Sequence, residues 1–281
     1  MILFDALRLN NRGVFEWSAA SCPVGSDDES AQIQSEDAIL SSFTASLNAV
    51  QLDIRQLSVA EEATGSTDAN GVERTLSFRA HQIDPFHSVL GDAANQSERF
   101  VFHRAFEATF VEDMIDGATV ADINMNDAVA CSACVIFNMA LVHHLKFLRD
   151  DRNLDGKQKA EQLYALALQA LESCALPFQN SSTILQSSLQ VIFLWIQLGA
   201  LNNLGALKSH GQAQDPESHE ESRSYFLEVM RVLNFVEREA KSSVDHSFHS
   251  LLNESEWNGM TRNCLAILFN MRRDQKIALA A

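Results

Sequence analysis

Proline and glycine are scarce in this chain of 281 residues, which contains 4 prolines and 11 glycines. Both residues interrupt helices and build turns, so their scarcity favours long helices over a turn-rich fold made only of strands. Hydrophobic residues make up 46% of the sequence, which is enough for a substantial core. We therefore expect a mainly α protein.

Basic residues are also few, since 21 lysines and arginines face 37 acidic residues and leave a net charge of -16. Such a surface repels phosphate backbones and anionic lipid headgroups, which argues against nucleic acid and membranes as partners. It attracts basic peptides, although the same charge is also typical of a merely soluble protein. We expect the partner to be a basic or apolar protein or peptide.

The chain lacks the marks of secretion and of membrane insertion. Its five cysteines are odd in number and irregularly spaced, which indicates reduced thiols rather than a disulfide framework. The first residues, MILFDALRLNNRG, do not combine a basic start with an apolar core, so they do not resemble a signal peptide. The apolar run 191–207 is too short and too polar for a membrane span. These absences predict a cytoplasmic protein.

Catalytic and cofactor motifs are missing as well. No glycine-rich nucleotide loop, no Walker lysine and no G-x-S-x-G string occurs, so we expect no cofactor and no catalytic residue. Cys131 and Cys134, followed by His143 and His144, have the right atom types for zinc. The two cysteines lie inside an apolar helical stripe, however, and buried thiols without a metal are the better interpretation.

Helical spacing of apolar residues predicts helices over 1–20 and 36–58 and repeatedly after residue 125. Residues 75–112 differ, because apolar and aromatic residues alternate there with polar ones, which predicts two antiparallel strands. We divide the chain into an N-terminal helical hairpin (1–60), a loop with a small β insert (61–124) and further helical hairpins (125–281). All three are expected to form one compact domain.

A short pattern with asparagine two residues before a small residue recurs in the first helix of each predicted hairpin. Its copies are Leu9-Asn10-Asn11-Arg12-Gly13, Phe137-Asn138-Met139-Ala140, Asn202-Asn203-Leu204-Gly205 and, more weakly, Phe269-Asn270-Met271-Arg272. The second helix then carries small and aromatic residues three or four apart, centred on Phe43, Tyr164 and Phe226. A coarse repeat of this kind indicates stacked helical units, and the small residue allows close approach of the two helices.

This pattern resembles the tetratricopeptide repeat, and the strings LNNRG and LNNLG resemble the first helix of kinesin light chain repeats. The chain is also similar to tetratricopeptide-like proteins of the diatom and algal type. The resemblance implies an α-α superhelix of stacked hairpins. The turns are longer than in an ordinary repeat of 34 residues, so a degenerate version is expected.

The resemblance also implies a concave groove lined by the first helix of each hairpin. The residues that it assigns to partner binding are Asn10, Val14, Trp17, Phe137, Leu141, His144, Asn202, Ala206 and Ser209. None of them is basic, which argues against a clamp for a C-terminal carboxylate. An asparagine amide carries a donor and an acceptor, so it can pair with a peptide backbone without demanding a sequence. The same positions would equally suit packing between hairpins.

These expectations favour a protein–protein interaction scaffold that binds a peptide or protein partner in a helical groove. One alternative is an enzyme whose site lies in the 75–112 insert. Its candidate residues are His81, His87, His103, Asp84, Asp92 and Glu98. Another is a structural subunit of a larger assembly. A scaffold predicts an open apolar groove without clustered titratable groups, whereas an enzyme predicts histidines and acids converging in one pocket.

Overall fold

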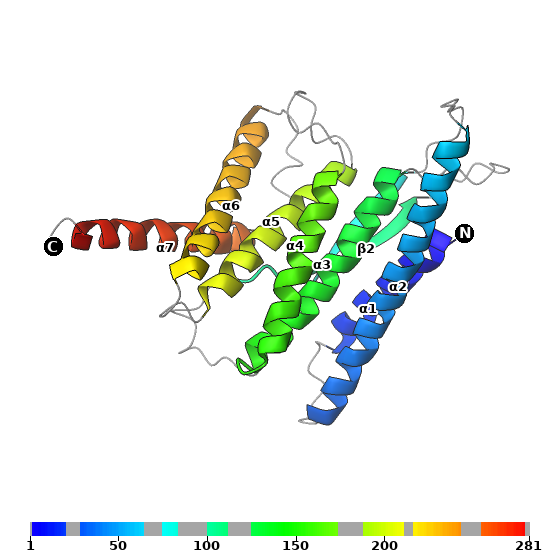
Figure 1. Cartoon of the computed structure of the whole chain (residues 1–281), viewed down its shortest axis with the longest axis horizontal. Coiled ribbons are helices and arrows are strands. Elements are labelled where there is room, and N and C mark those ends of the chain that lie inside the picture. The colour runs from blue at the N-terminus through cyan, green and yellow to red at the C-terminus, as the bar shows by residue number, and fades with distance from the viewer. Residues whose placement is uncertain are drawn as a thin grey trace. The chain divides into compact units, whose positions relative to one another are not determined.

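We describe the protein from a computed structural model. The residues that the structure describes are 2–20, 29–64, 75–83, 100–111, 125–173, 188–210, 216–242 and 254–278. Over these ranges the chain is mainly helical with one small sheet of two strands, which confirms the coarse prediction of the fold class (Figure 1). Part of the predicted insert, residues 84–99 and 112–124, lies outside them.

The elements follow one another as two helices, two strands and five further helices in the described part of the chain. They are α1 (Ile2–Ala20), α2 (Glu29–Thr64), β1 (Thr75–Gln82), β2 (Arg104–Val111), α3 (Met125–Arg149), α4 (Leu154–Ser173), α5 (Ser188–Ser209), α6 (Pro216–Ser242) and α7 (Glu254–Ala278).

The tertiary contacts divide the chain into two compact units. The first unit comprises Met1–His87 and His103–Ile196, and the second comprises Ser88–Phe102 and Gln197–Ala281. The division therefore falls within α5 and within the stretch that leads into β2. Each unit has its own buried side chains and is described by itself below.

In the first unit, α1 packs against α2 and α3 packs against α4, while α2 also contacts α3 (Figure 1). Charges complement the α3 dipole, with Asp127 in the first turn and Lys146 and Arg149 in the last. The same two cations tie α3 to α2, since Lys146 Nζ lies 3.1 Å from Asp37 Oδ1 and Arg149 pairs with Glu36.

A close approach between α1 and α2 explains the first glycine of the repeated pattern. A Cβ added to Gly13 would lie 2.7 Å from the buried ring of Phe43, so no larger residue fits there unless the ring moves. Nearby, the Ser46 hydroxyl donates to the Ala6 carbonyl at 2.7 Å. In the next hairpin, Ala140 and Tyr164 are both fully buried. The predicted contact of the small residue with the aromatic is confirmed for Gly13 and Phe43.

The second unit repeats this packing between the C-terminal half of α5 and α6. A Cβ on Gly205 would lie 2.8 Å from the ring of Phe226. The Ser222 hydroxyl donates to the Gly205 carbonyl at 2.8 Å, which satisfies a buried polar group at the contact. Helix α7 packs against α6, and the Cys264 thiol donates to the Phe226 carbonyl at 3.3 Å.

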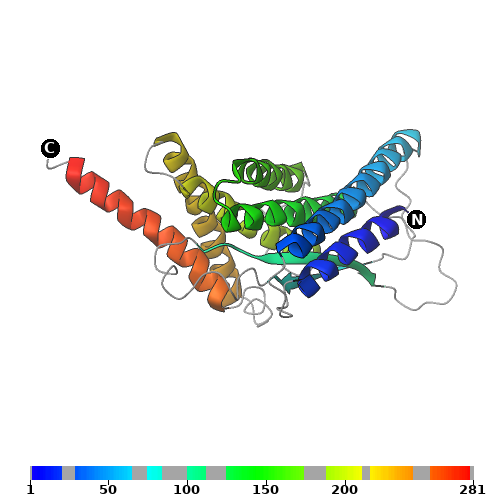
Figure 2. The same cartoon turned by 90° about the horizontal axis from the view of Figure 1, so that it is seen from below.

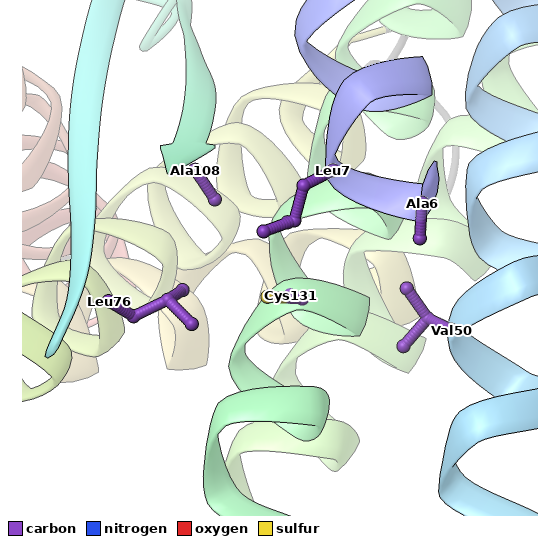
Figure 3. Packing of buried hydrophobic residues seen from close by; sticks show 6 residues of the cluster. All are labelled: Ala6, Leu7, Val50, Leu76, Ala108 and Cys131. Atoms are coloured by element: carbon purple, nitrogen blue, oxygen red, sulfur yellow. The ribbon is translucent and has the colours of Figure 1, made fainter. Parts of the chain in front are cut away.

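The two strands form an antiparallel hairpin whose register runs from Thr75↔Val111 to Gln82↔Arg104. In the first unit β2 contacts both α1 and α3, so the hairpin lies along these helices (Figure 2). One core cluster joins side chains from four of these elements and from α2 (Figure 3). Its members are Ala6, Leu7, Val50, Leu76, Ala108 and Cys131.

Two helices of the described part, Met125–Arg149 and Gln190–Ser209, are long and apolar enough to cross a membrane. The central helices of water-soluble proteins often pass the same test. Here 83% and 78% of the two apolar windows are buried inside the fold, which accounts for their composition without a bilayer.

Candidate functional site: asparagine clusters on an extended segment

The stretch 100–111 is extended, and its backbone has hydrogen-bonding groups along two edges. On one edge, the Ile83 amide donates to the His103 carbonyl at 3.0 Å, next to the β1–β2 ladder. Bonded and non-bonded pairs alternate in an antiparallel ladder. Residues of β2 with odd numbers therefore turn their amide and carbonyl groups toward β1. Residues with even numbers turn theirs to the opposite edge, which faces the helices.

The first asparagine cluster, Asn10, Asn11 and Asn138, occupies that opposite edge in the first unit. The Asn138 side chain accepts from the Phe106 amide at 2.9 Å and donates to the Phe106 carbonyl at 2.9 Å. Asn11 does the same for Ala108, at 3.1 Å and 2.8 Å. Each of these two asparagines thus holds both backbone groups of a single residue, as a neighbouring strand would.

Asn10 completes the first cluster by connecting its members. Its amide nitrogen donates to the Phe106 carbonyl at 2.9 Å and lies 3.2 Å from Asn11 Oδ1. Its oxygen accepts from Asn138 Nδ2 at 3.0 Å. Because Asn10 and Asn138 are fully buried, each of these bonds replaces water that the amides have lost.

The second asparagine cluster, Asn202, Asn203 and Asn263, lies in the second unit. Asn203 holds the Phe102 amide and carbonyl at 2.7 Å and 2.8 Å. Asn263 holds the Phe100 amide and carbonyl at 2.9 Å and 2.7 Å. Asn202 donates to the Phe100 carbonyl at 3.0 Å and accepts from Asn263 Nδ2 at 2.8 Å. Asn202 Nδ2 also lies 3.2 Å from Asn203 Oδ1.

The two clusters are chemically equivalent, member by member. Asn10 corresponds to Asn202, Asn11 to Asn203 and Asn138 to Asn263, because each partner makes the same kinds of bond. In both, the Asn-Asn pair comes from one helix and the third asparagine from another. The first pair stands in the string LNNRG and the second in LNNLG, so the repeated pattern of the sequence produces the repeated site.

The chemistry of this arrangement is recognition of a peptide backbone. A primary amide has one acceptor oxygen and a donor nitrogen at a separation that suits the amide and carbonyl of one extended residue. A carboxylate could only accept, and an ammonium group could only donate. The clusters therefore require an extended chain and impose no demand on its side chains through these bonds.

Side chains of the held segment enter apolar surroundings. The fully buried Phe106 ring lies 5.3 Å from the Phe137 ring and stacks on Trp195 at 5.9 Å between centroids. The Arg104 guanidinium lies 5.7 Å from the Trp195 centroid, in reach of a cation–π interaction. In the second unit, a Cβ on Gly259 would lie 2.3 Å from the Phe100 ring, so glycine is needed there.

The structure brings two of the predicted partner-binding residues, Asn10 and Asn202, onto a peptide backbone, which belongs to the chain itself. Six others are buried: Val14, Trp17, Phe137, Leu141, His144 and Ala206. Trp17 packs edge-on against Phe43, and His144 Nδ1 lies 3.4 Å from the Tyr164 hydroxyl. Ser209 is half-buried, and its hydroxyl donates to the Ala206 carbonyl at 2.7 Å. That these nine predicted residues bind another molecule stays a prediction.

Four members of the clusters were not predicted as contacts. Asn11, Asn138 and Asn203 were recognised as anchors of the repeat, but the resemblance assigned the groove to neighbouring positions. Asn263 was missed entirely, since no small residue follows it two positions later and the weaker fourth copy was placed on Asn270. The side chain of Asn270 lies outside the described residues.

The described residues contain no group of three or more histidines, cysteines or acids that could hold a metal ion. Cys131 and Cys134 are free thiols, and burial raises the pKa of both. In the insert, His81 Nε2 lies 2.6 Å from Glu107 Oε2, and both side chains are partly exposed. The other candidate residues Asp84, His87, Asp92 and Glu98 fall outside the part that the structure describes.

Comparison with known proteins returned no match from family models, from curated proteins or from solved structures.

Proposed function

We propose that this protein is a protein–protein interaction scaffold that holds an extended polypeptide by its backbone through the asparagine clusters. The observation that carries the proposal is the paired grip on Phe106, Ala108, Phe102 and Phe100, each held at amide and carbonyl by one asparagine. Within the described residues this complete backbone grip, on amide and carbonyl by one side chain, occurs four times.

We further propose that the hairpins form a degenerate tetratricopeptide-like array. Two features support this. Glycine is pressed against a buried phenylalanine at Gly13–Phe43 and again at Gly205–Phe226, and a buried serine lies near each aromatic, Ser46 three residues after Phe43 and Ser222 four residues before Phe226. In such arrays the first helix of each hairpin faces the ligand, and the Asn-Asn pairs come from α1 and α5 in this way.

The partner class follows from charge as well as from geometry. With a net charge of -16, the chain favours a basic or apolar polypeptide and disfavours nucleic acid. We propose the cytoplasm as its location, because the described cysteines Cys131, Cys134 and Cys264 are free thiols, as expected in a reducing compartment. No cofactor is required by a site that works through amide groups.

The test is affinity purification followed by quantitative mass spectrometry, comparing the wild type with Asn10→Ala plus Asn202→Ala. The matched control is Asn48→Ala plus Asn234→Ala, which makes the same change at two exposed positions on helices α2 and α6. Both double variants are first checked for helical content and melting temperature. We expect specific partners to be lost with the cluster variant alone, and each such partner is then titrated as a purified protein. An identical set of partners at equal affinity in a folded cluster variant would rule the proposal out.

A further inference from the structure

We propose that residues 100–108 are an internal occupant of the asparagine clusters, and that an external peptide of the same pattern binds by replacing them. This inference rests on the proposed function and adds to it the class of ligand and the means of regulation. The ligand is an extended peptide with large aromatic side chains two and four residues apart and basic residues near them.

Replacement is required because the cluster atoms are already in use. In the first cluster, Asn138 and Asn11 each engage both their oxygen and their nitrogen with Phe106 and Ala108. The second cluster engages Asn203 and Asn263 in the same way with Phe102 and Phe100. A second backbone cannot satisfy the same amides at the same time, so the internal segment and an external peptide compete.

The side chains of the internal segment define what an external peptide must offer. Phe102 and Phe106 are fully buried, and the Phe100 ring fills the space left by Gly259. Truncating such rings leaves cavities, so a peptide without aromatic residues at these places loses most of the apolar gain. The partly exposed Arg104 over Trp195 shows where a cation is favourable.

Charge points to the same class of ligand. The stretch 99–106, RFVFHRAF, carries two arginines and one histidine and no acid, within a chain whose net charge is -16. Residues 99–111, which extend this occupant at both ends and carry Arg99 and Arg104 against Glu107, are thus a weakly basic, aromatic stretch in an acidic protein. An external peptide of this composition is attracted by the whole chain before it reaches the clusters.

The grip on the internal segment is reversible in chemical terms. Hydrogen bonds and apolar contacts hold residues 100–108, and they contain no cysteine that could fix them covalently. The advantage of the internal segment is that its covalent attachment raises its effective concentration above that of a free peptide. Cutting the chain on both sides of the segment removes this advantage while the fold is already formed.

The experiment uses the full chain with protease recognition sequences placed within 84–99 and 112–124. The folded protein is purified and then cut at both places. The cuts leave β1 joined to the N-terminal fragment and free the segment to exchange with an added peptide. A fluorescent peptide with the sequence of residues 99–111, RFVFHRAFEATFV, is added to cut and uncut protein. Binding is followed by fluorescence anisotropy.

We expect the cut protein to bind the labelled peptide at least about tenfold more tightly than the uncut protein. A control peptide with Phe100→Ser, Phe102→Ser and Phe106→Ser should bind the cut protein at least about tenfold more weakly than the original peptide. Asn138→Ala in the cut protein should weaken peptide binding by about tenfold, whereas the exposed change Asn48→Ala should leave it unaltered.

Equal peptide affinity of cut and uncut protein, or equal affinity for the serine peptide, would overturn the inference. A cut protein that stays folded, takes up no peptide and instead forms dimers would overturn it in favour of a second copy of the chain as occupant. These outcomes are separable from the proposed function. Partners that uncut protein captures through Asn10 and Asn202 would keep the scaffold proposal standing even where the peptide fails to exchange.

Discussion

At the residue scale, the distinctive group is the side-chain amide of asparagine. Asn11, Asn138, Asn203 and Asn263 each use it to bind the amide and carbonyl of one residue in the extended segment. A peptide unit buried without partners costs several times more than a typical hydrogen bond contributes. These side chains therefore stabilise the segment chiefly by preventing unsatisfied backbone groups in the interior.

The first prediction concerns Asn138, whose removal leaves the Phe106 amide without its acceptor and Asn10 Oδ1 without its donor. We expect Asn138→Ala to lower the free energy of unfolding by about 2–4 kcal/mol. Urea denaturation followed by circular dichroism measures this loss. The exposed Asn48→Ala should change the same quantity by less than about 0.5 kcal/mol. Equal effects of the two substitutions would contradict the burial argument.

The second prediction concerns Gly13, where helix propensity and packing oppose each other. Alanine favours the helix by about 1 kcal/mol over glycine, but its Cβ meets the buried Phe43 ring, and overpacking costs about 1–3 kcal/mol. We expect Gly13→Ala to be destabilising. A double-mutant cycle with Phe43→Leu should show that the pair costs less than the sum of the single changes, by about 1 kcal/mol. Additive changes in the free energy of unfolding would mean that the Phe43 ring moves aside at little cost.

The third prediction concerns His143, where burial, together with Lys159 and Lys146, lowers the pKa from 6.5 to about 4 against an opposing effect of Asp155. Between these two pH values the unfolded chain binds a proton that the folded chain does not. Stability linked to His143 is therefore complete above pH 6.5 and is lost as the pH falls toward 4.

We expect His143→Gln to have a flatter dependence of melting temperature on pH than the wild type across this interval. Thermal melts at a series of pH values measure the difference between the two proteins. The difference should stay constant above pH 6.5 and change only below it. Two curves that run parallel down to pH 4 would show that His143 does not cause the acid sensitivity.

At the scale of elements, β2 pairs with one strand, β1, among the residues that the structure describes. Its other edge is closed by amides from α1 and α3, which stand where a third strand would be. The hairpin is thereby joined to the helices by directional bonds in addition to the apolar contacts of Leu76 and Ala108. This explains why a sheet of two strands, which is marginal in isolation, is ordered here.

The fourth prediction follows from these two edges. Asn11→Ala should accelerate hydrogen exchange at the Ala108 amide, because Asn11 Oδ1 is its acceptor. The neighbouring Glu107 amide faces β1 by the alternation of the ladder and should be affected much less. Nuclear magnetic resonance of the exchanging amides measures both in one sample. Equal acceleration at the two positions would mean that the whole strand has opened.

Much of the secondary structure was predictable from the sequence, because apolar residues recur at different short spacings in helices and in strands. The helix expected over 36–58 occurs within α2, and the two strands expected in 75–112 are β1 and β2. The pairing of Gly13 with Phe43 was also predicted from a spacing that the repeat supplies. The position of the extended segment was not predictable in this way. Asn11 and Ala108 are 97 residues apart, and no local pattern records such a contact.

The candidate site was predicted in part for the same reason. Asparagine was expected to bind a peptide backbone, and the amides of Asn10 and Asn202 do bond to one in the chain itself. Which asparagines grip both backbone groups depends on how each helix turns toward the segment. Neighbouring side chains of a helix point about 100° apart around its axis. Only the tertiary structure therefore decides which of two adjacent asparagines binds both backbone groups.

At the scale of the whole molecule, the contacts divide the chain within α5 and just before His103. The sequence shows no shift of composition at either place, so the predicted boundaries near residues 60 and 125 follow loops instead. Each unit contains one asparagine cluster together with the part of the segment that it holds. The site is therefore repeated once in each unit.

The fifth prediction uses this division. Asn138→Ala should raise hydrogen exchange mainly in the helices of the first unit, such as α3 and α4, and Asn203→Ala mainly in α6 and α7 of the second. The reason is that each amide holds backbone groups of its own unit. Exchange measured by mass spectrometry on both variants provides the comparison. A uniform rise along the chain in both variants would indicate a single cooperative unit.

The closed edge of β2 has a consequence for solubility. The stretch RFVFHRAFEATF holds four phenylalanines within twelve residues, in the alternating pattern that promotes strand stacking between chains. Exposed edges of such strands are templates for aggregation, and proteins usually protect them with charges, prolines or bulges. In this protein, helices carrying asparagine provide the protection. Every event that frees the segment also exposes an aggregation-prone strand, so release should be brief or coupled to capture by another chain.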